Sequence, residues 1–573
     1  MRARLAAATL LVLPCLAAPA EAAEPIMPLS QVQAGMRCTG ASVIRGTEVR
    51  TFNAEVIDVV DGDPTQIGPR ILVSVSGPAV DATGVGPGFS GSPITCPDGA
   101  GVPRVVGAIS ESIGEYGGKV VLAAPIESIL GTQPAAPPQA KAARSTLRRA
   151  RPLSAPLTVS GVRGRLARGL ASVGRRIGRP ILAVPAGPLG SYPPQQLRPG
   201  AAMAVGYSAG DFSVGAIGTV AYTDGDAVWG FGHPNDGVGR RSLLLQDAYV
   251  FRVINNPNVV EEIGTTYKLA ASGHPLGTLS DDTLASVAGR VGGLPPTIPM
   301  DIHATDLDTG ARRDYRTQIA DETDLDDPMG STALNFVAPV AVSQAATAAL
   351  GSTPARATGT MCARLTVREL SDPIRVCNRY VTGSLDESGI GSLLAARAGQ
   401  DVLDLVSQLD TYKAGRVHPT GLSVTLDLRR GQRQAFLREV DLPAHVLPGR
   451  TVRAKVRLQT FRGPSITRSY RVRIPPLLGR GLRNLKFAGA DIDGGQEDLL
   501  GGLGDVLTVD LEEETPGAGS LGPPTVDALA RRMREVQRYD GVMMRAGGED
   551  IKGFRDKEWR ISGRASATVR VTR

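Results

Sequence analysis

Short segments rich in β-branched residues, separated by glycine, aspartate and proline turns, recur along most of this 573-residue chain. Early examples lie at residues 41–44, 51–60 and 71–76, and later ones at 422–428 and 451–458. The 69 glycines and 42 prolines supply the turns that many short strands need. The pattern therefore predicts a mainly β fold, and the length predicts two to four domains.

The N-terminus has the pattern of a secretory signal peptide. Arg2 and Arg4 precede an apolar run over residues 5–18, and small residues follow at positions 20 and 22. We expect residues 1–23 to be removed, which predicts a protein that is secreted or held in the cell envelope. No later segment offers about 20 uninterrupted apolar residues, so no membrane span is expected.

The cysteines that remain after this cleavage are even in number, which favours disulfides in an exported protein. The simplest pairing is local and joins Cys38 to Cys96 and Cys362 to Cys377. The second pair would close a short loop across a predicted hairpin. None of the four has C-x-x-C spacing, so we expect no metal site, and no cofactor is expected either.

The net charge of +7 is small for a chain of this length. It argues against a nucleic-acid binder and is compatible with an acidic envelope as surroundings. A basic run at residues 144–151 follows a stretch rich in proline and alanine. We interpret that region as a solvated linker.

The hexapeptide Gly88-Phe89-Ser90-Gly91-Ser92-Pro93 has the frame G-x-S-G-x-P. The glycine at 88 would let its own N–H and that of Ser90 converge on one point, which is the geometry of an oxyanion hole. A turn at 97–101 and an apolar strand at 105–110 follow, as in the strand pair after the nucleophile of trypsin-like folds. The alternative is a simple tight turn, because Gly, Ser and Pro are the commonest turn residues.

A serine nucleophile needs a base within reach, and only five histidines are present. His233 is the best candidate because it ends a predicted hairpin (215–222 and 227–231) between Gly232 and Pro234. The other four are assigned to a surface loop, a strand and the C-terminal sandwich: His274, His303, and the pair His418 and His445. A histidine flanked by glycine is weak evidence by itself.

Together, two segments resemble the SpoIVB-type serine peptidases. Residues 215–234, with their Asp-Gly turn and Phe-Gly-His-Pro ending, resemble the histidine segment of that family, and residues 88–94 resemble its nucleophile segment. Residues 27–36 and 279–291 resemble neighbouring parts, so the resemblance spans roughly 27–300. It implies a trypsin-like double β-barrel in which Ser90 is the nucleophile, His233 the general base, and Gly88 and Ser90 form the oxyanion hole.

Two departures from the family pattern stand out. Ser90 precedes His233, whereas the sporulation peptidase has the opposite order, so we expect the two barrels in permuted order. The orienting acid is not fixed by a motif: Asp282 is our choice, Asp81 and Asp236 stay open, and a Ser/His dyad fits equally well.

The domain organisation follows from these segments. We expect a peptidase domain over residues 24–300, with a serine half (24–132), a linker (133–160) and a histidine half (161–300). A mixed α/β region (301–415), an Ig-like β-sandwich (416–476) and a C-terminal α/β segment (477–573) complete the chain.

The resemblance implies an exported serine endopeptidase of narrow specificity, whose substrate is a protein or peptide partner or the chain itself. The alternative is a catalytically inactive envelope protein on a protease-like scaffold, which binds a partner through the sandwich.

Overall fold

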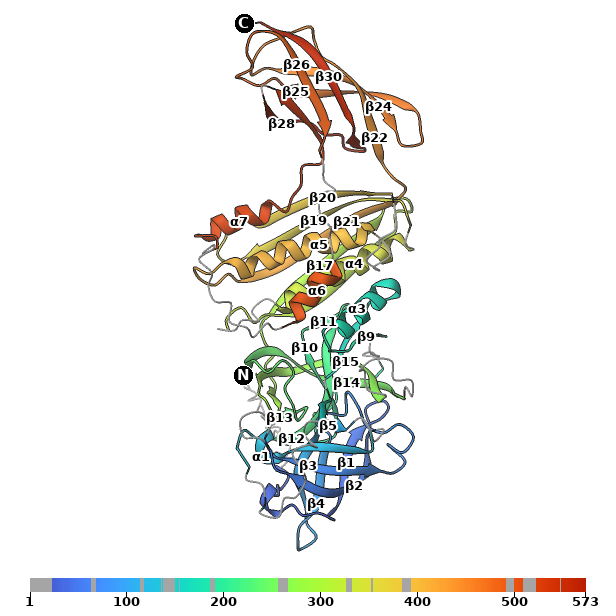
Figure 1. Ribbon diagram of the computed structural model, residues 1–573, viewed down its shortest axis with the longest axis vertical. Coiled ribbons are helices and arrows are strands. Elements are labelled where there is room, and N and C mark those ends of the chain that lie inside the picture. The colour runs from blue at the N-terminus through green and yellow to red at the C-terminus, as the bar shows by residue number, and fades with distance from the viewer. Residues whose placement is uncertain are drawn as a thin grey trace, which may run out of the picture.

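The computed structural model describes residues 23–62, 68–113, 118–134, 137, 150–153, 155–185, 191–255, 266–325, 332–351, 354–383, 393–490, 499–508, 522–546 and 548–572. Figure 1 shows three tiers along the longest axis of the molecule. Two β-barrels lie at one end, a sheet with helices lies in the middle, and a C-terminal sandwich lies at the other end.

The first barrel carries the serine turn. Its sheet closes in the order β4-β1-β2-β3-β6-β5, with β4 paired to β5. The turn at Ser90 lies between β3 and β4, and the barrel interior is one apolar cluster. The elements are η1 (Leu29–Gln31), β1 (Arg37–Val43), β2 (Val49–Val60), β3 (Arg70–Ser76), β4 (Pro93–Pro97), β5 (Pro103–Ile113), β6 (Val120–Pro125), α1 (Ile126–Ile129) and the added edge strand β7 (Ala150–Pro152).

The second barrel carries the histidine turn. Its sheet closes in the order β10-β14-β15-β16-β13-β12, with β10 paired to β12. The expected hairpin is formed by β12 and β13, which turn at Gly225 with φ of 57°. The elements are β8 (Leu157–Ser160), α3 (Gly164–Arg176), β9 (Ile181–Val184), β10 (Ala202–Gly206), β12 (Val214–Asp224), β13 (Ala227–Gly230), β14 (Gly239–Asn255), β15 (Thr266–Asp282) and β16 (Val287–Val291).

The prediction of a double β-barrel is confirmed: the chain forms two closed, six-stranded antiparallel barrels. The serine barrel comes first in the chain and the histidine barrel second. Two parts of the predicted linker (133–160) are strands. Strand β7 extends the first sheet, and strand β8 extends the second.

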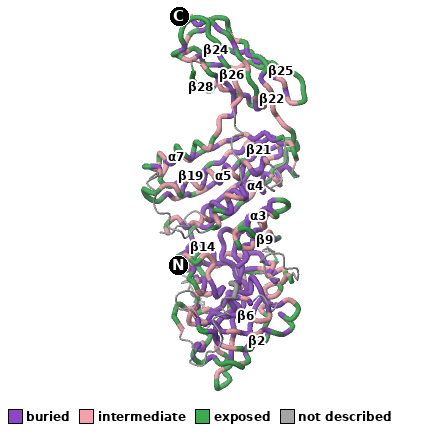
Figure 2. Tube along the Cα trace, viewed as in Figure 1, coloured by how far each residue is buried: buried purple, intermediate pink, exposed green. Residues whose placement is uncertain are grey.

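The middle tier is a six-stranded sheet with α4 and α5 packed against it. Its apolar cluster is continuous with that of the second barrel, which also contributes strand β11, and Figure 2 shows how much of both tiers is buried. In the described residues, α4 alone is long and apolar enough to cross a membrane, and it is mostly buried. The elements are β11 (Ser208–Gly210), β17 (Thr297–Asp306), β18 (Arg312–Ala320), α4 (Thr332–Leu350), β19 (Ala357–Val367), β20 (Ile374–Thr382), α5 (Leu393–Ser407), η3 (Gln408–Thr411) and β21 (Pro419–Arg430).

The C-terminal tier is a β-sandwich whose two sheets bury one apolar cluster. Sheet β25-β24-β22-β29 packs on sheet β23-β30-β26-β27-β28. The strands are β22 (Gln434–Asp441), β23 (His445–Val446), β24 (Thr451–Thr460), β25 (Ser465–Arg473), β26 (Gly481–Gly489), β27 (Val542–Ala546), β28 (Glu549–Phe554), β29 (Arg560–Ser562) and β30 (Arg564–Val571).

The predicted boundaries around this sandwich need correction. Strand β21 falls in the predicted sandwich (416–476) but pairs in parallel with β17 of the middle sheet. The predicted α/β segment (477–573) is divided: its strands complete the sandwich, while α6 (Leu499–Leu507) and α7 (Val526–Arg534) pack into the middle tier. The reason is that strand alternation marks a half-buried strand but does not say which sheet it joins.

Both predicted disulfides are confirmed. Cys38–Cys96 joins β1 to β4 of the serine barrel, and Cys362–Cys377 joins directly opposed residues of β19 and β20. They indicate an oxidising, extracellular-type environment. The expected signal peptide (1–23) falls outside the described residues except for position 23, and most of the basic run at 144–151 also lies outside them.

Candidate active site at the junction of the barrels

The serine turn is a tight loop held by its own backbone. The Phe89 N–H donates to the Gly86 carbonyl over 2.9 Å, and the Ser92 N–H donates to the Phe89 carbonyl over 2.9 Å. Gly88 and Gly91 have φ of +91° and +88°, values that favour glycine. The glycines of the G-x-S-G frame are therefore required by the backbone.

Two N–H groups of this turn are free to bind a ligand. Within the described residues, the N–H groups of Gly88 and Ser90 donate to no other group, although the N–H groups between and after them do. The Ser90 side chain is fully buried, and its Oγ has no hydrogen-bond partner in that part of the chain. A hydroxyl beside two unengaged N–H groups is the arrangement that acyl transfer needs.

The histidine turn is strained. Phe231 and Gly232, the two residues before His233, both have φ of 69°, which is uncommon for a bulky residue such as phenylalanine. The Phe231 ring is fully buried and packs where Gly218 has no side chain: a Cβ there would lie 2.3 Å from the ring. This packing holds the strained backbone that presents His233.

The His233 ring is held in one tautomer. Its Nδ1 lies 2.6 Å from the Pro234 carbonyl, which can only accept, so Nδ1 carries the proton. Nε2 is then the basic nitrogen; it makes no hydrogen bond among the described residues, although the Leu153 backbone also acts to raise the pKa of the ring. Burial lowers the pKa of His233 and outweighs the Pro234 carbonyl and the charge of Glu111, which act to raise it. The ring is therefore a neutral base near pH 7.

The two turns meet against one strand. The Gly91 N–H donates to the Ile109 carbonyl of β5 over 2.8 Å, and a Cβ on Gly232 would lie 3.2 Å from that same carbonyl oxygen. A Cβ on Gly91 would lie 2.6 Å from the Phe231 nitrogen. The residue after Ser90 thus touches the turn that carries His233. Ser90 Oγ and His233 Nε2 lie at this junction without a hydrogen bond between them.

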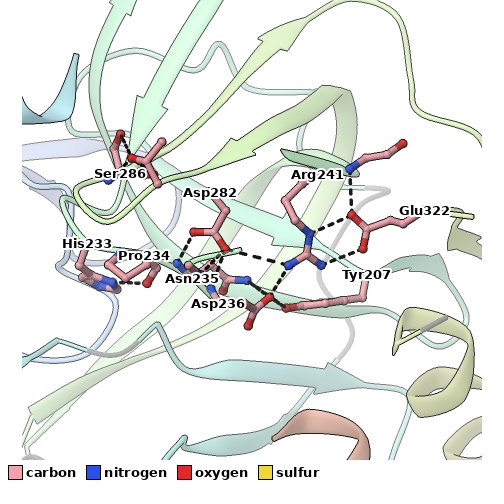
Figure 3. Close-up of polar contacts among 12 residues, drawn as sticks. Tyr207, His233, Pro234, Asn235, Asp236, Arg241, Asp282, Ser286 and Glu322 are labelled. Carbon is pink, nitrogen blue, oxygen red and sulfur yellow. Dashed lines mark hydrogen bonds and ion pairs between the residues drawn. The ribbon is translucent and has the colours of Figure 1, made fainter. Parts of the chain in front are cut away.

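Asp282 does not contact the His233 ring, contrary to a direct orienting role. Its carboxylate accepts the N–H of Asn235 over 2.7 Å and also those of Asp236 and Gly237 (Figure 3). The Pro234–Asn235 peptide therefore receives His233 Nδ1–H on its carbonyl and binds Asp282 through its N–H. Asp282 acts on the histidine one peptide away, by holding the loop.

The other two acids left open by the sequence lie elsewhere. Asp81 accepts from Gly77 N–H and pairs with Lys119 at the surface. The Asp236 side chain is buried and binds Arg179, Arg241 and Tyr207 behind the histidine loop (Figure 3). Burial acts to raise the pKa of Asp236, but the two guanidinium groups outweigh it and hold the pKa below its usual range.

Glu111 and Lys268 were missed by the sequence reasoning. Glu111 is a buried residue of β5 that pairs with Arg70 over 2.9 Å and accepts a hydrogen bond from Ser110. Its charge acts to raise the pKa of His233. Lys268 of β15 is fully buried, and burial lowers its pKa to about 7. The signal in the sequence was an isolated charge: Glu111 is the one charged residue in the stretch 105–113, and Lys268 is the one lysine, arginine or acid in the stretch 266–280.

The remaining histidines have other partners. His274 Nδ1 lies 3.0 Å from Asp247, His303 pairs with Asp314, and His445 lies in β23. His418 binds Glu369 and Asp324 beside the middle sheet, so its expected place in the sandwich is corrected.

Comparison with protein-family models, curated proteins and solved structures returned no match to this chain. No relative therefore supplies an activity or a substrate. The chemistry of the junction has to be inferred from its motifs, contacts and burial.

Proposed function

We propose that this protein is an exported serine endopeptidase, with Ser90 as nucleophile and His233 as general base. The observation that carries the proposal is the pair of unengaged N–H groups at Gly88 and Ser90, set against a turn whose histidine is neutral and protonated on Nδ1. The resemblance of both segments to SpoIVB-type peptidases supports the same roles. The two disulfides support action outside the cytoplasm.

The reaction would follow the acyl-transfer scheme of serine peptidases. His233 Nε2 takes the proton of Ser90 Oγ as the oxygen attacks the peptide carbonyl. The N–H groups of Gly88 and Ser90 bind the oxyanion that forms. His233 then gives the proton to the leaving amine, and water hydrolyses the acyl-enzyme by the same steps in reverse order.

Access to the site supports narrow specificity. Ser90 is fully buried and His233 is 3% exposed, so a substrate segment must displace part of the junction before it reaches the hydroxyl. Such a requirement disfavours general digestion. It is compatible with cleavage of one partner protein or of the chain itself.

The same burial favours a second candidate, a catalytically inactive envelope protein that binds a partner through its C-terminal sandwich. Ser90 Oγ and His233 Nε2 each lack a hydrogen-bond partner within the described residues. A catalytic pair is often loose before substrate binds, so this geometry is compatible with both candidates.

Labelling with a fluorophosphonate probe separates the two candidates. We expect the purified wild-type protein to be labelled on Ser90, and the Ser90→Ala and His233→Ala variants to be unlabelled. Ser76→Ala is the matched control, because Ser76 is an exposed serine at the end of β3 in the same barrel. A folded wild-type protein that takes up no label would reject the peptidase and leave the binding protein.

A further inference from the structure

Strands of the histidine barrel hold the backbone of the serine turn. Lys268 N–H of β15 donates to the Pro87 carbonyl over 2.9 Å. Thr219 of β12 donates its hydroxyl to the Gly88 carbonyl over 3.0 Å and its N–H to the Ser90 carbonyl over 2.8 Å. Two residues of the second barrel therefore bind three carbonyls of the turn that carries the candidate nucleophile.

These contacts determine where the free N–H groups point. The C=O and N–H of a trans peptide point in opposite directions, so the bond to the Pro87 carbonyl sets the direction of the Gly88 N–H. The Phe89 carbonyl is held by the N–H and hydroxyl of Ser92, which sets the direction of the Ser90 N–H. The peptide between these two is held by Thr219 at its carbonyl and by Gly86 at its N–H.

The Lys268 side chain completes this support. Its Nζ donates to Thr219 Oγ1 over 3.1 Å and to Ser42 Oγ over 2.7 Å. Its stem passes beside Gly88, where a Cβ would lie 2.9 Å from the Lys268 Cβ, and Nζ lies 4.5 Å from the centre of the Phe89 ring. Hydrogen bonds thus run from Lys268 through Thr219 to the Gly88 carbonyl.

A lysine in this position is unfavourable for stability. Lys268 is fully buried, and within the described residues no carboxylate pairs with it. Burying an amine without a counter-ion costs free energy that an apolar side chain of the same size would not. Among the described residues, the hydrogen bonds of its Nζ go to Thr219 and Ser42, and Thr219 in turn binds the serine turn.

We propose that Lys268 is a positioning residue, which acts through Thr219 to hold the Gly88 carbonyl and so keeps the N–H groups of Gly88 and Ser90 aimed at a common oxyanion. The proposal rests on the proposed function of Ser90. It adds that the histidine barrel supplies the support of the oxyanion hole as well as the general base.

Fluorophosphonate labelling kinetics of the full-length protein test this role. Lys268→Met keeps the length of the side chain and removes the donors, and Thr219→Val keeps the shape and removes the hydroxyl. We expect each to lower the maximal labelling rate by about 10-fold or more, since losing one oxyanion donor outright costs 10²–10³-fold. The probe concentration for half-maximal rate should change little.

Two matched variants separate positioning from packing. Ser213→Ala removes a buried hydroxyl of the histidine barrel that binds Ser208 and Ser272 and no part of the serine turn, and it should label at nearly the wild-type rate. Thr219→Ser keeps the hydroxyl and should restore most of the rate lost in Thr219→Val. The double variant Lys268→Met/Thr219→Val should be no slower than the slower single variant, because both break the same chain of bonds.

The outcomes are distinguishable. Wild-type labelling combined with unchanged rates in folded Lys268→Met and Thr219→Val overturns the role of Lys268 and leaves the peptidase intact. Multiplying effects in the double variant, or a Thr219→Ser as slow as Thr219→Val, also overturn it. An unlabelled wild type overturns the peptidase and this role together. Thermal unfolding of every variant identifies any that fails to fold. If Lys268→Met does not fold, the comparison of Thr219→Val with Thr219→Ser tests the proposed role.

Discussion

At the residue scale, the candidate site at the junction of the barrels is marked by two buried polar atoms that make no hydrogen bond among the described residues. Ser90 Oγ and His233 Nε2 are buried and unengaged, whereas Ser92, Thr219 and Lys268 around them are linked to one another or to the turn backbone. A buried polar atom without a partner is costly, so its presence beside a strained turn marks a place where function competes with stability.

The titration of His233 gives a prediction at this scale. A general base works when neutral, and burial places its pKa below the ordinary value of 6.5. Labelling of Ser90 should therefore stay above half of its maximum at pH 6.5 and fall only as the pH drops through the lowered pKa. A pH profile of the labelling rate measures this, with unfolding followed at each pH as control. A midpoint above pH 6.5 would contradict it.

At the element scale, the two disulfides connect strands in different ways. Cys38–Cys96 joins β1 and β4, which closes the barrel just after the serine turn and spans 58 residues of sequence. Cys362–Cys377 spans 15 residues of sequence within the hairpin of β19 and β20. A longer cross-linked loop constrains the unfolded chain more.

Replacing each disulfide by two alanines should show this difference. Loop entropy predicts a loss of about 4 kcal/mol in unfolding free energy for the Cys38–Cys96 pair and about 3 kcal/mol for the Cys362–Cys377 pair. The first replacement should also slow Ser90 labelling, because Pro93 of β4 follows the serine turn directly. Thermal unfolding and labelling of both variants measure these effects. Slower labelling in the second variant alone would argue against the assigned site.

At the scale of the whole molecule, the histidine barrel and the middle tier are joined by one core and by buried charges. Arg241 of β14 binds Asp236 behind the histidine loop and Glu322, which follows β18 of the middle sheet. The Arg241 side chain is fully buried. The loop that carries His233 is thereby tied to a different tier of the molecule.

Arg241→Met should strongly destabilise this connection. It leaves Asp236 without one of its two guanidinium partners and Glu322 buried without its arginine, and breaking a buried pair costs about 3–5 kcal/mol. Arg290→Met is the control, because Arg290 and its partner Asp226 are both exposed and an exposed pair contributes little. Denaturant unfolding compares the two variants, and similar losses in both would contradict the proposed connection.

Much of the architecture could be predicted because it is encoded locally. The hairpin with its turn at Gly225, the glycines around Ser90 and the Cys362–Cys377 pair all depend on residues close together in sequence. The double barrel followed from a resemblance that covers both candidate catalytic segments. The sheet that β21 joins could not be predicted, since its parallel partner β17 lies more than a hundred residues earlier.

The sequence by itself determined the strands and turns, the disulfide partners, and Ser90 and His233 as the residues to examine, because turn geometry and strand alternation are properties of near neighbours. Only the tertiary structure decided that Asp282 reaches His233 through a peptide, that the charge of Glu111 acts on the pKa of His233, and that Lys268 supports the serine turn. The Asp282 contact joins the end of β15 to the loop after β13, and the Lys268 contact joins β15 to the other barrel, so both depend on how distant parts of the chain pack.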